Sequence, residues 1–377
     1  MKRILVLGGS YLQSDFINTA VNLGNEVFVL DKDINCYMSK CDKIKFDLVD
    51  ISDLEKVNSY FVTNKCDFVI SPVTEIGNYI SACVSERHGL RYNTIKTVKS
   101  TTNKKIMREA LLTSSLHEPK VLEYILGEGI PNGMSFPFIV KPSVSSASRG
   151  VSLVRTENEF YVAIESASKY VKEGEAILLE EYIRGEQFSI ETISFNGKHI
   201  VLALVKEIIS EAPFFMERID IIDAGLNMGL KNQIVEFSSN LLSILNIQYG
   251  PCHIEVKIEG SQIRLIEIAS RSGLLRDRLI NTALGMNYNK LIIDSYNGND
   301  VAGIDNFLPK TNALMGIILY PQDQEVFEEL KLAGNISDYH LNGNSFSETP
   351  TMLTDAVGYF FTRNDIVDDL YNIQLRL

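Results

Sequence analysis

The chain has 377 residues, more than one compact hydrophobic core usually holds, so its length predicts two or three domains. Its 36 lysines and arginines against 48 aspartates and glutamates give a formal net charge of −12, which argues against a nucleic-acid or anionic-membrane partner because both need an attractive field. Hydrophobic residues make up 45% and charged residues 22%, a composition typical of a globular protein and not of a disordered one.

The first part of the chain alternates strand and helix patterns. Predicted strands cover residues 4–7, 26–30, 43–46 and 67–71, and apolar residues at helical spacing predict helices over 16–23 and 54–61. Such alternation indicates a parallel sheet with right-handed crossovers. Since ligands of these sheets bind at the carboxyl ends of the strands, Gly8, Gly9, Ser10 and Asp31 border a natural crevice.

The middle of the chain is rich in strand patterns. A helix is predicted over 95–112, then strands over 138–141, 151–154, 176–181, 188–195 and 199–208, with one helix over 157–170. A helix over 231–245 leads into two strands, 251–257 and 263–269, joined by a turn at 258–261 that is typical of a hairpin. We therefore expect an α+β region with a small antiparallel sheet, followed by mixed helix and strand signals over 301–377.

Membrane spans and disulfides are not predicted. No apolar run reaches the roughly 18 residues of a transmembrane helix, and the short apolar run at the start indicates a first β-strand. The five cysteines are odd in number and include no CxxC pair, which favours reduced thiols over a disulfide framework or a zinc site. We expect a cytoplasmic protein.

The hairpin carries the strongest chemical signal. Glu255 and Glu267 lie on its paired strands among apolar neighbours, and alternation places Arg271 on the same face as Glu267. Two adjacent carboxylates repel unless a cation lies between them, and carboxylate oxygens together with nucleotide phosphates suit Mg²⁺. Arg271 could then bind a transferring phosphate bidentately. The alternative is a pair of solvated acids on an exposed face.

Three weaker motifs precede the hairpin. A strand ending in Lys141 is followed by a loop of small residues, 143–151, whose backbone N–H groups can face a polyphosphate; the alternative is a plain hairpin connection, and GxxxxGK[ST] is absent. The strand over 177–183 runs into acidic residues. Its extended end could be a hinge that binds adenine through backbone groups, with a following carboxylate on the ribose; alternatively, the acids are simply solvated. Lys104 on the helix over 95–112 is either directed at phosphate or a solvated surface lysine.

Together these motifs resemble the ATP-grasp superfamily over about residues 1–300. The resemblance implies a combined α/β and α+β fold. It divides the chain into a Rossmann-like domain over 1–95, an ATP-grasp domain over 96–300 with a mobile ATP-lid subdomain within 115–185, and a small C-terminal α+β segment over 301–377 that completes the grasp or covers the active site.

The resemblance also implies roles for individual residues. Arg271 and Lys141 would be catalytic, and Glu255 and Glu267 would bind the metal. The implied nucleotide ligands are Lys104, Lys141, Ser145, Ser146, Ser148, Gly150, Glu180, Glu181, Ile183 and Glu186. Many members have an asparagine ligand where this chain has Ala269, which leaves the number of metal ions open.

The implied activity is that of an ADP-forming ligase that joins a carboxylate to an amine, or to a thiol, through an acyl phosphate. ATP and Mg²⁺, with Mn²⁺ as an alternative, would be the cofactors. The loop sequence is most similar to the carbamoyl-phosphate-synthase-like and amino-acid-ligase branches, which favours an amino acid or another small carboxylic acid. Arg149, Arg276 and Arg278 are candidate substrate ligands, the alternative for the last two being a salt bridge with Asp277.

Three other functions remain open. A purine-biosynthesis-type relative would act on a phosphoribosyl substrate, and a non-catalytic relative would only bind ATP. A nicotinamide-dependent oxidoreductase would use Gly8, Gly9, Ser10 and Asp31, although the later glycines of GxGxxG are missing. The expected partners are small-molecule carboxylate and amine substrates, without nucleic acid or membrane, and a homodimer is left open.

Overall fold

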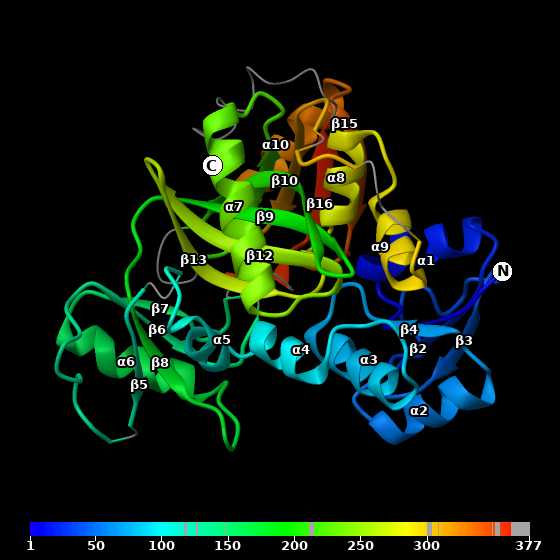
Figure 1. The fold of residues 1–377 in the computed structure, drawn as a ribbon. Coiled ribbons are helices and arrows are strands. Elements are labelled where there is room, and N and C mark those ends of the chain that lie inside the picture. The colour runs from blue at the N-terminus through cyan, green and yellow to red at the C-terminus, as the bar shows by residue number, and fades with distance from the viewer. Residues whose placement is uncertain are drawn as a thin grey trace.

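The computed structural model describes residues 1–116, 119–125, 127–146, 148–210, 215–299, 304–307, 309–348, 350 and 355–362. Within these ranges the strands form two four-stranded sheets and one eight-stranded sheet. In Figure 1 the eight-stranded sheet lies above, and the two smaller sheets lie at opposite sides below it with helices between them. None of the described helices combines the length and the apolar character needed to cross a membrane.

The N-terminal sheet is parallel, as predicted. It contains β1 (Arg3–Leu7), β2 (Glu26–Asp31), β3 (Lys45–Leu48) and β4 (Phe68–Ile70) in the order β3-β2-β1-β4. Helix α1 (Tyr11–Asn22) covers one face, and α2 (Leu54–Thr63) and the unpredicted α3 (Glu75–Arg87) cover the other. Because both faces are buried, Ile4 and Val6 pack towards α1 while Leu5 and Leu7 pack towards α2 and α3.

The single helix predicted over 95–112 is wrong, because the chain forms α4 (Ile95–Thr102) and α5 (Lys104–Leu111) with a break at Asn103. Asn103 has extended backbone angles, and its side chain accepts hydrogen bonds from the backbone N–H groups of Lys105 and Ile106. An asparagine that caps a helix in this way starts a new helix axis. The break places Lys104 in the first turn of α5.

The smaller antiparallel sheet contains β5 (Val121–Tyr124), β6 (Phe138–Pro142), β7 (Ser152–Val154) and β8 (Ile177–Glu181), in the order β5-β8-β6-β7. Helix α6 (Glu157–Ser168) packs on one face through Phe160, Ala163 and Ile164. This confirms a small antiparallel sheet, to which the structure adds β5, but the predicted strands over 188–195 and 199–208 belong to the eight-stranded sheet. Figure 1 shows this unit apart from the N-terminal sheet, with α4 and α5 between them.

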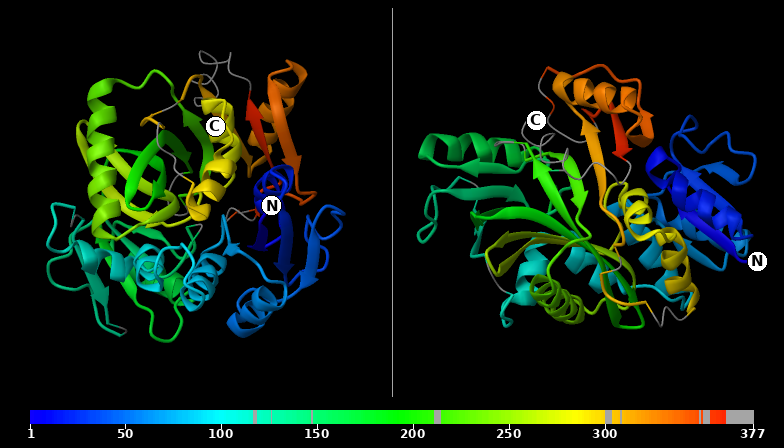
Figure 2. Two further views of the ribbon diagram at one scale, coloured as in Figure 1. Left: turned by 45° about the vertical axis from the view of Figure 1, so that its right-hand side comes forward. Right: turned by 90° about the horizontal axis from the view of Figure 1, so that it is seen from above.

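The eight-stranded sheet is antiparallel throughout, in the order β13-β12-β9-β10-β11-β14-β16-β15. Its strands are β9 (Glu186–Phe195), β10 (Lys198–Ile209), β11 (Glu217–Ile222), β12 (Tyr249–Glu259), β13 (Gln262–Ala269), β14 (Ala313–Ile318), β15 (Ile336–Leu341) and β16 (Gly358–Thr362). The described part of 301–377 thus extends the sheet with three strands and adds α10 (Pro321–Leu332), which packs on β14. Figure 2 shows these C-terminal elements beside the rest of the sheet.

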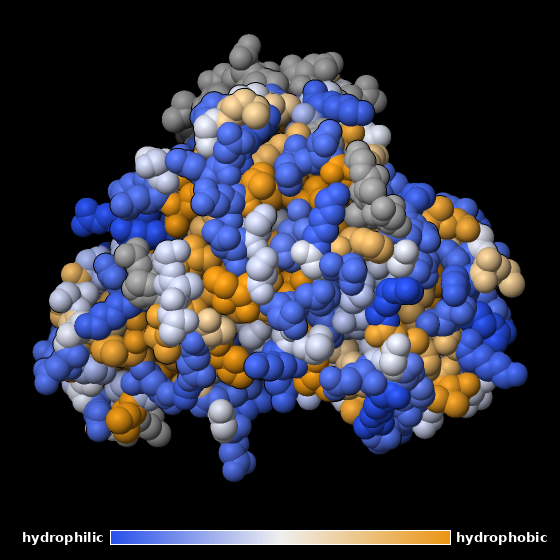
Figure 3. All heavy atoms as spheres, viewed as in Figure 1, coloured by the Kyte–Doolittle hydropathy of each residue, from blue (hydrophilic) through white to orange (hydrophobic). Residues whose placement is uncertain are grey.

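Helices cover both faces of this sheet. Figure 1 shows α7 (Met228–Ile244) lying across β9 and β12, where its apolar face packs on Ile190, Ile254 and Val256. On the other face, α8 (Arg276–Leu284) and α9 (Tyr288–Asn297) share one core with α1 and the N-terminal sheet. The face shown in Figure 3 mixes hydrophilic and apolar residues, which is ordinary because polar atoms are too few to cover a globular surface.

The end of β13 is anchored on the N-terminal domain. The side-chain amide of Asn78 in α3 donates to the carbonyl oxygen and the hydroxyl of Ser270, at 3.1 and 3.0 Å. The hydroxyls of Thr101 and Ser270 lie 2.7 Å apart, and the backbone N–H of Ser272 donates to the carbonyl oxygen of Pro72. The residues that follow the predicted metal strand are therefore held by contacts to a distant part of the chain.

Gly316 tests the packing between β14 and β16. A Cβ atom at Gly316 would lie 2.1 Å from the Phe360 ring, so we expect Gly316→Ala to lower the free energy of unfolding by about 1–3 kcal/mol, the usual cost of overpacking. Urea denaturation followed by circular dichroism measures this effect. Gly129→Ala is the matched control, because a Cβ atom there would meet nothing within 4 Å. Equal midpoints for the two variants would contradict the prediction.

Candidate active site

The two hairpin acids lie directly opposite one another. Glu255 on β12 is the register partner of Glu267 on β13, and their side chains are 21% and 27% exposed. Both project from the face of the sheet that lies opposite α7, since their direct neighbours Val256 and Ile268 pack towards that helix. The predicted pairing is confirmed, and the alternative of two freely solvated acids is wrong. Their role as metal ligands stays a prediction.

The electrostatics of this pair favour a bound cation. Burial and the neighbouring Glu267 raise the pKa of Glu255 above its usual value. Burial would also raise the pKa of Glu267, but Lys104 and Lys141 outweigh it, and the Lys104 ammonium lies 2.7 Å from Glu267 Oε2. Two partly buried carboxylates of which only one has a lysine partner fit a divalent ion between them.

The donor set fits magnesium better than a fully protein-bound metal. Among the described residues, no group of three or more His, Cys, Asp or Glu side chains is arranged to hold a metal ion. Mg²⁺ commonly takes one or two carboxylates and completes its coordination with waters and phosphate oxygens. Glu255 and Glu267 supply that number, and Ala269 at the end of β13 adds no further oxygen ligand.

Lys104 and Lys141 converge on the same region from different elements. The Lys104 ammonium donates to the carbonyl oxygen of Ser145 at 2.8 Å, and its backbone N–H donates to that of Ser143. Lys141 lies near the end of β6, and its ammonium is 2.5 Å from Oε2 of Glu180 on β8. Both lysines are buried, so they are not solvated surface lysines.

The small-residue loop is a tight turn held by its own hydrogen bonds. The Ser145 hydroxyl donates to the carbonyl oxygen of Arg149, and the Ser148 hydroxyl donates to that of Phe215. Ser148 and Gly150 adopt left-handed backbone angles, with φ of 56° and 73°. A Cβ atom at Gly150 would lie within 3.0 Å of both Tyr170 and Pro142, so glycine is required there. Ala147 lies outside the described residues.

Arg149 is exposed on this loop, and its guanidinium donates to the carbonyl oxygen and the hydroxyl of Ser146. It thus lies beside the lysine-bearing strand, and both of these contacts are to uncharged oxygen atoms. Its assignment to a substrate stays a prediction.

The Glu180 side chain is buried between two cations, which the sequence did not indicate. Arg108 Nε donates to Glu180 Oε1 at 3.1 Å, and Lys141 binds the other oxygen. Burial would raise the pKa of Glu180, but Arg108 and Lys141 outweigh it and lower the pKa to about 2. Glu180 therefore holds the lysine in place, and any hinge contact to a nucleotide must come from the backbone.

The rest of the predicted hinge lies at the edge of the sheet. Glu181 is exposed, Ile183 is buried, and Glu186 forms an ion pair with Lys206 at 2.6 Å. Gly185 has a φ of 109°, and a Cβ atom there would lie 2.5 Å from the carbonyl oxygen of Ile258. This close approach brings the hinge against β12, the strand that carries Glu255. No contact tests the expected nucleotide roles of these residues.

Arg271 has a partner that the sequence did not indicate. Its guanidinium binds Glu75 Oε1 through Nε at 2.8 Å and Nη2 at 2.7 Å, and Nη1 donates to the carbonyl oxygen of Ser272. Glu75 lies in the first turn of α3, nearly 200 residues earlier in the chain. The arginine thus faces the predicted site while being oriented by the N-terminal domain.

Arg276 does not fit its expected role as a free substrate ligand. It is fully buried and binds Glu191 at 3.1 Å, Glu207 at 2.8 Å and Asp220. These acids come from β9, β10 and β11, so α8 inserts the guanidinium into an acidic part of the sheet. The alternative salt bridge with Asp277 is not formed by the side chain of Arg276 in the described contacts.

Arg278 also has intramolecular partners. Its guanidinium lies 2.9 Å from Asp15 and 2.8 Å from Asp338, and 4.3 Å from the centre of the Tyr11 ring. It therefore joins α8 to α1 and β15, and none of these described contacts is an ion pair with Asp277; its assignment to a substrate stays a prediction. Asp277 instead accepts a hydrogen bond from the side chain of Asn289.

A row of acids that the sequence analysis missed continues across the sheet from Glu255. His253 links Glu255, at 3.4 Å, to Glu191, at 2.6 Å, and Glu207 and Asp220 follow on the next strands. Burial raises the pKa of Asp220 to about 6 despite the opposing effect of Arg276. The sequence does contain a signal for this row: an acid such as Glu191 stands alone within a strand pattern of mostly apolar residues.

The glycine turn after β1 does not support a nicotinamide-dependent oxidoreductase. Asp31 at the end of β2 accepts hydrogen bonds from the backbone N–H groups of Gly9, at 2.8 Å, and Asp33, at 2.9 Å. Both carboxylate oxygens are thereby used within the chain. An oxidoreductase of this type needs that carboxylate for the ribose of its cofactor.

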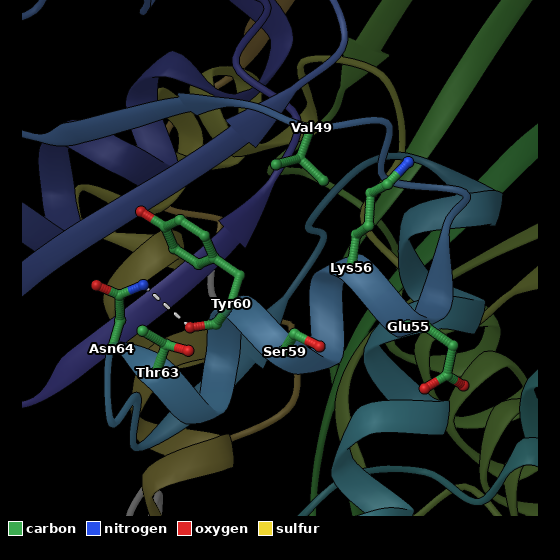
Figure 4. A pocket seen from close by; sticks show the side chains of 7 residues that line it. All are labelled: Val49, Glu55, Lys56, Ser59, Tyr60, Thr63 and Asn64. Carbon is green, nitrogen blue, oxygen red and sulfur yellow. Dashed lines mark hydrogen bonds between the residues drawn. The ribbon is translucent and has the colours of Figure 1, made fainter.

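A surface hollow on the N-terminal domain is separate from these residues. Figure 4 shows Tyr60, Asn64 and other side chains of α2 around it, with Asn64 donating to the carbonyl oxygen of Tyr60 at 3.0 Å. That bond belongs to the end of the helix. The hollow contains none of the predicted site residues, and we assign it no chemistry.

Comparison with known proteins agrees with this geometry. A model described as an ATP-grasp domain matches residues 134–274. This part of the chain, which contains Lys141, Glu255 and Glu267, is similar to an ATP-grasp domain. The chain is 38% identical over 80 residues to a D-alanine–D-alanine ligase of Petrotoga mobilis, a match that spans 21% of this chain and 26% of that enzyme. It is 26% identical over 308 residues to the ligase of the same name from Flavobacterium johnsoniae, covering 74% of this chain and 93% of the ligase.

Solved structures share the whole fold. An L-amino acid ligase from Bacillus licheniformis superposes with a TM-score of 0.84 at 20% identity, covering all of this chain and 97% of the ligase. A carboxyaminoimidazole ribonucleotide synthase from Aspergillus clavatus, solved with ATP, gives a TM-score of 0.78 at 16% identity, covering all of this chain and 97% of that chain. At these identities the likeness establishes the fold, including the sheets on either side of the ATP-grasp domain's predicted site.

The Glu180 ion pairs predict an acid-sensitive step in the stability of the ATP-grasp domain. Because the pKa of Glu180 is lowered from 4.5 to about 2, its contribution to stability is fully present above pH 4.5 and is lost as the pH falls towards 2. We expect Glu180→Gln to lower stability at pH 5 and to show a smaller further loss between pH 5 and pH 3 than the parent. Thermal denaturation at both pH values measures this, with the exposed Glu181→Gln as control. A Glu180→Gln profile parallel to that of the parent would contradict the prediction.

Proposed function

We propose that this protein is an ATP-dependent, ADP-forming ligase that joins the carboxylate of an amino acid or another small acid to an amine. The observation that carries the proposal is the register pairing of Glu255 with Glu267, with the Lys104 ammonium on Glu267, inside an ATP-grasp domain. This arrangement offers a cation site next to buried lysines, which is what transfer of a phosphoryl group from ATP requires.

In the proposed reaction a carboxylate oxygen of the substrate attacks the γ-phosphorus of ATP, and the bond to the ADP oxygen breaks. The amine then attacks the carbonyl carbon of the acyl phosphate, and inorganic phosphate leaves as the amine loses its proton. Mg²⁺ held by Glu255 and Glu267 would neutralise charge on the phosphates. No enzyme nucleophile is needed, so the chemistry depends on positioning and charge.

The chain's own residues would supply most of that positioning. Lys141 is fixed by Glu180 and Lys104 by Ser145 and Glu267, so both ammonium groups are preorganised before the nucleotide binds. We propose that backbone N–H groups of Ser145, Ser146, Ser148 and Gly150 bind the phosphates, and that 180–183 with Glu186 binds the nucleoside. Arg271, oriented by Glu75, would face the transferring phosphate or the substrate carboxylate.

The charge of the neighbouring sheet favours an amine substrate over a phosphoribosyl one. Glu191, Glu207 and Asp220 extend from Glu255, and the cation among them, Arg276, is fully enclosed. A substrate phosphate next to such a surface would be repelled, whereas an ammonium group would be attracted. Purine-type enzymes remain the second candidate, because carboxyaminoimidazole ribonucleotide synthase has the same fold.

The proposal also includes the domain organisation, the location and the partners of the protein. We propose the division into domains at 1–95, 96–300 and 301–377, a mobile lid within 115–185, and a cytoplasmic location. The partners would be small-molecule carboxylates and amines, and light scattering would distinguish a monomer from a homodimer.

An ADP-release screen tests the proposed reaction. Amino acids and small carboxylic acids are offered singly and in pairs with ATP and Mg²⁺, and mass spectrometry identifies the products. We expect ADP release that depends on a pair and a product lighter than the two substrates together by one water. Turnover only with a phosphoribosyl substrate would establish the second candidate instead, and the absence of nucleotide binding would exclude both.

Glu267→Gln is expected to lower the rate of ADP release about a hundredfold to a thousandfold, because the amide removes one of the paired charges on which the metal site depends. Coupled-enzyme assay of ADP measures the rate, and circular dichroism checks that the fold is retained. Glu259→Gln, an exposed acid at the end of the same hairpin, is the matched control and should keep the parent rate. A Glu267→Gln variant as active as the control would remove this residue from the site.

A further inference from the structure

Arg108 touches three parts of the predicted ATP site at once. It lies on α5, one helical turn after Lys104, so both side chains leave the same face of the helix. Its guanidinium binds Glu180 of the smaller sheet, and its Nη2 donates to the carbonyl oxygens of Leu265 and Ile266 on β13, at 3.1 and 2.9 Å. The side chain is buried, so these bonds replace solvent contacts.

The β13 carbonyls that Arg108 binds belong to a β-bulge. The pairing with β12 runs from Glu255 opposite Glu267 to Val256 opposite Leu265, which leaves Ile266 as an extra residue. A bulge interrupts the ladder of hydrogen bonds and redirects the side chains next to it. Since β13 is the edge strand of the sheet, no further strand covers these carbonyl groups.

The bulge lies immediately before Glu267. Without a donor at Leu265 and Ile266, the edge strand could relax towards a regular ladder or fray, and the Glu267 carboxylate would move relative to Glu255. Arg108 supplies that donor from a rigid helix whose first residue, Lys104, binds the same carboxylate. Helix α5 therefore fixes Glu267 in two ways: Lys104 binds its carboxylate, and Arg108 binds the backbone immediately before it.

We propose that Arg108 is a positioning residue that fixes the bulge at Ile266 and thereby sets the place of Glu267 as a metal ligand. Through Glu180 it also joins this strand to Lys141, so the metal side and the phosphate side of the site share one guanidinium. The inference rests on the proposed ATP site and adds Arg108, which acts there through Glu267 and Lys141.

Arg108→Lys is the informative variant. A lysine keeps a positive charge for Glu180, but a single ammonium cannot reproduce the fork of donors that spans the carboxylate and two carbonyl groups. The matched control is Lys105→Met on the same helix, because Lys105 forms an exposed ion pair with Glu123 and contacts none of the site residues in the described part of the chain.

Calorimetric titration with the non-hydrolysable analogue AMP-PNP, with Mg²⁺ and with EDTA, separates the two sides of the site. We expect Arg108→Lys to bind AMP-PNP like the parent in EDTA. The factor by which Mg²⁺ raises the affinity should be about tenfold smaller in Arg108→Lys than in the parent, the usual effect of losing a residue that orients a metal ligand. Lys105→Met should match the parent in both conditions.

Two calorimetric results would overturn the proposal. One is a parent-like gain from Mg²⁺ in Arg108→Lys. The other is an equal loss with and without Mg²⁺, which would place its effect on Lys141 instead of Glu267.

Hydrogen exchange tests Arg108 independently of the proposed function. If the parent does not bind AMP-PNP, the ATP proposal fails, yet the role of Arg108 in the bulge is still measurable. We expect amides of 264–268 to exchange at least about tenfold faster in Arg108→Lys than in Lys105→Met, because the edge strand opens more often. Unchanged exchange there would overturn the positioning role.

Discussion

Like-charge repulsion between Glu255 and Glu267 is the constraint around which the site is built. Two carboxylates in register on neighbouring strands are unfavourable unless positive charge is placed with them. The chain provides it through Lys104 on Glu267 and, at 3.4 Å, through His253 on Glu255, yet the pKa of Glu255 remains raised. The break at Asn103 is part of this arrangement, because it starts α5 where Lys104 reaches the hairpin. An exposed pair would need none of these contacts, so the proposed Mg²⁺ would relieve a repulsion that the chain itself offsets only in part.

The charges of the site are segregated between the two sheets. Lys141 and the loop with Arg149 belong to the smaller sheet, whereas Glu191, Glu207 and Asp220 belong to the eight-stranded one, and α8 buries Arg276 among them. A polyphosphate is favoured on the first side and an ammonium group on the second. The reaction proposed here needs both, with the reacting carboxylate between them.

The sequence predicted what depends on local pattern. Strand alternation and a short turn define the hairpin, so the pairing of Glu255 with Glu267 could be inferred without knowing any other part of the fold. The ion pair of Glu180 could not be predicted because its partner Arg108 lies 72 positions earlier, and nothing near Glu180 in the sequence indicates it. Arg276 was misread for the same reason, since its acids come from three strands that only the sheet brings together. Helix breaks such as the one at Asn103 depend on a single cap, which apolar periodicity does not detect.

The N-terminal domain is part of the site as well as a neighbour of it. Arg271 follows the metal strand but is oriented by Glu75, and Ser270 is held by Asn78 one turn further along α3. Arg271 and Ser270 are thus fixed by a helix whose own core is formed with the parallel sheet. Separating the N-terminal domain would leave the hairpin and its two acids but release the arginine beside them. For this reason the site cannot be reduced to the matched ATP-grasp segment, and its geometry requires contacts from residue 75 to residue 276.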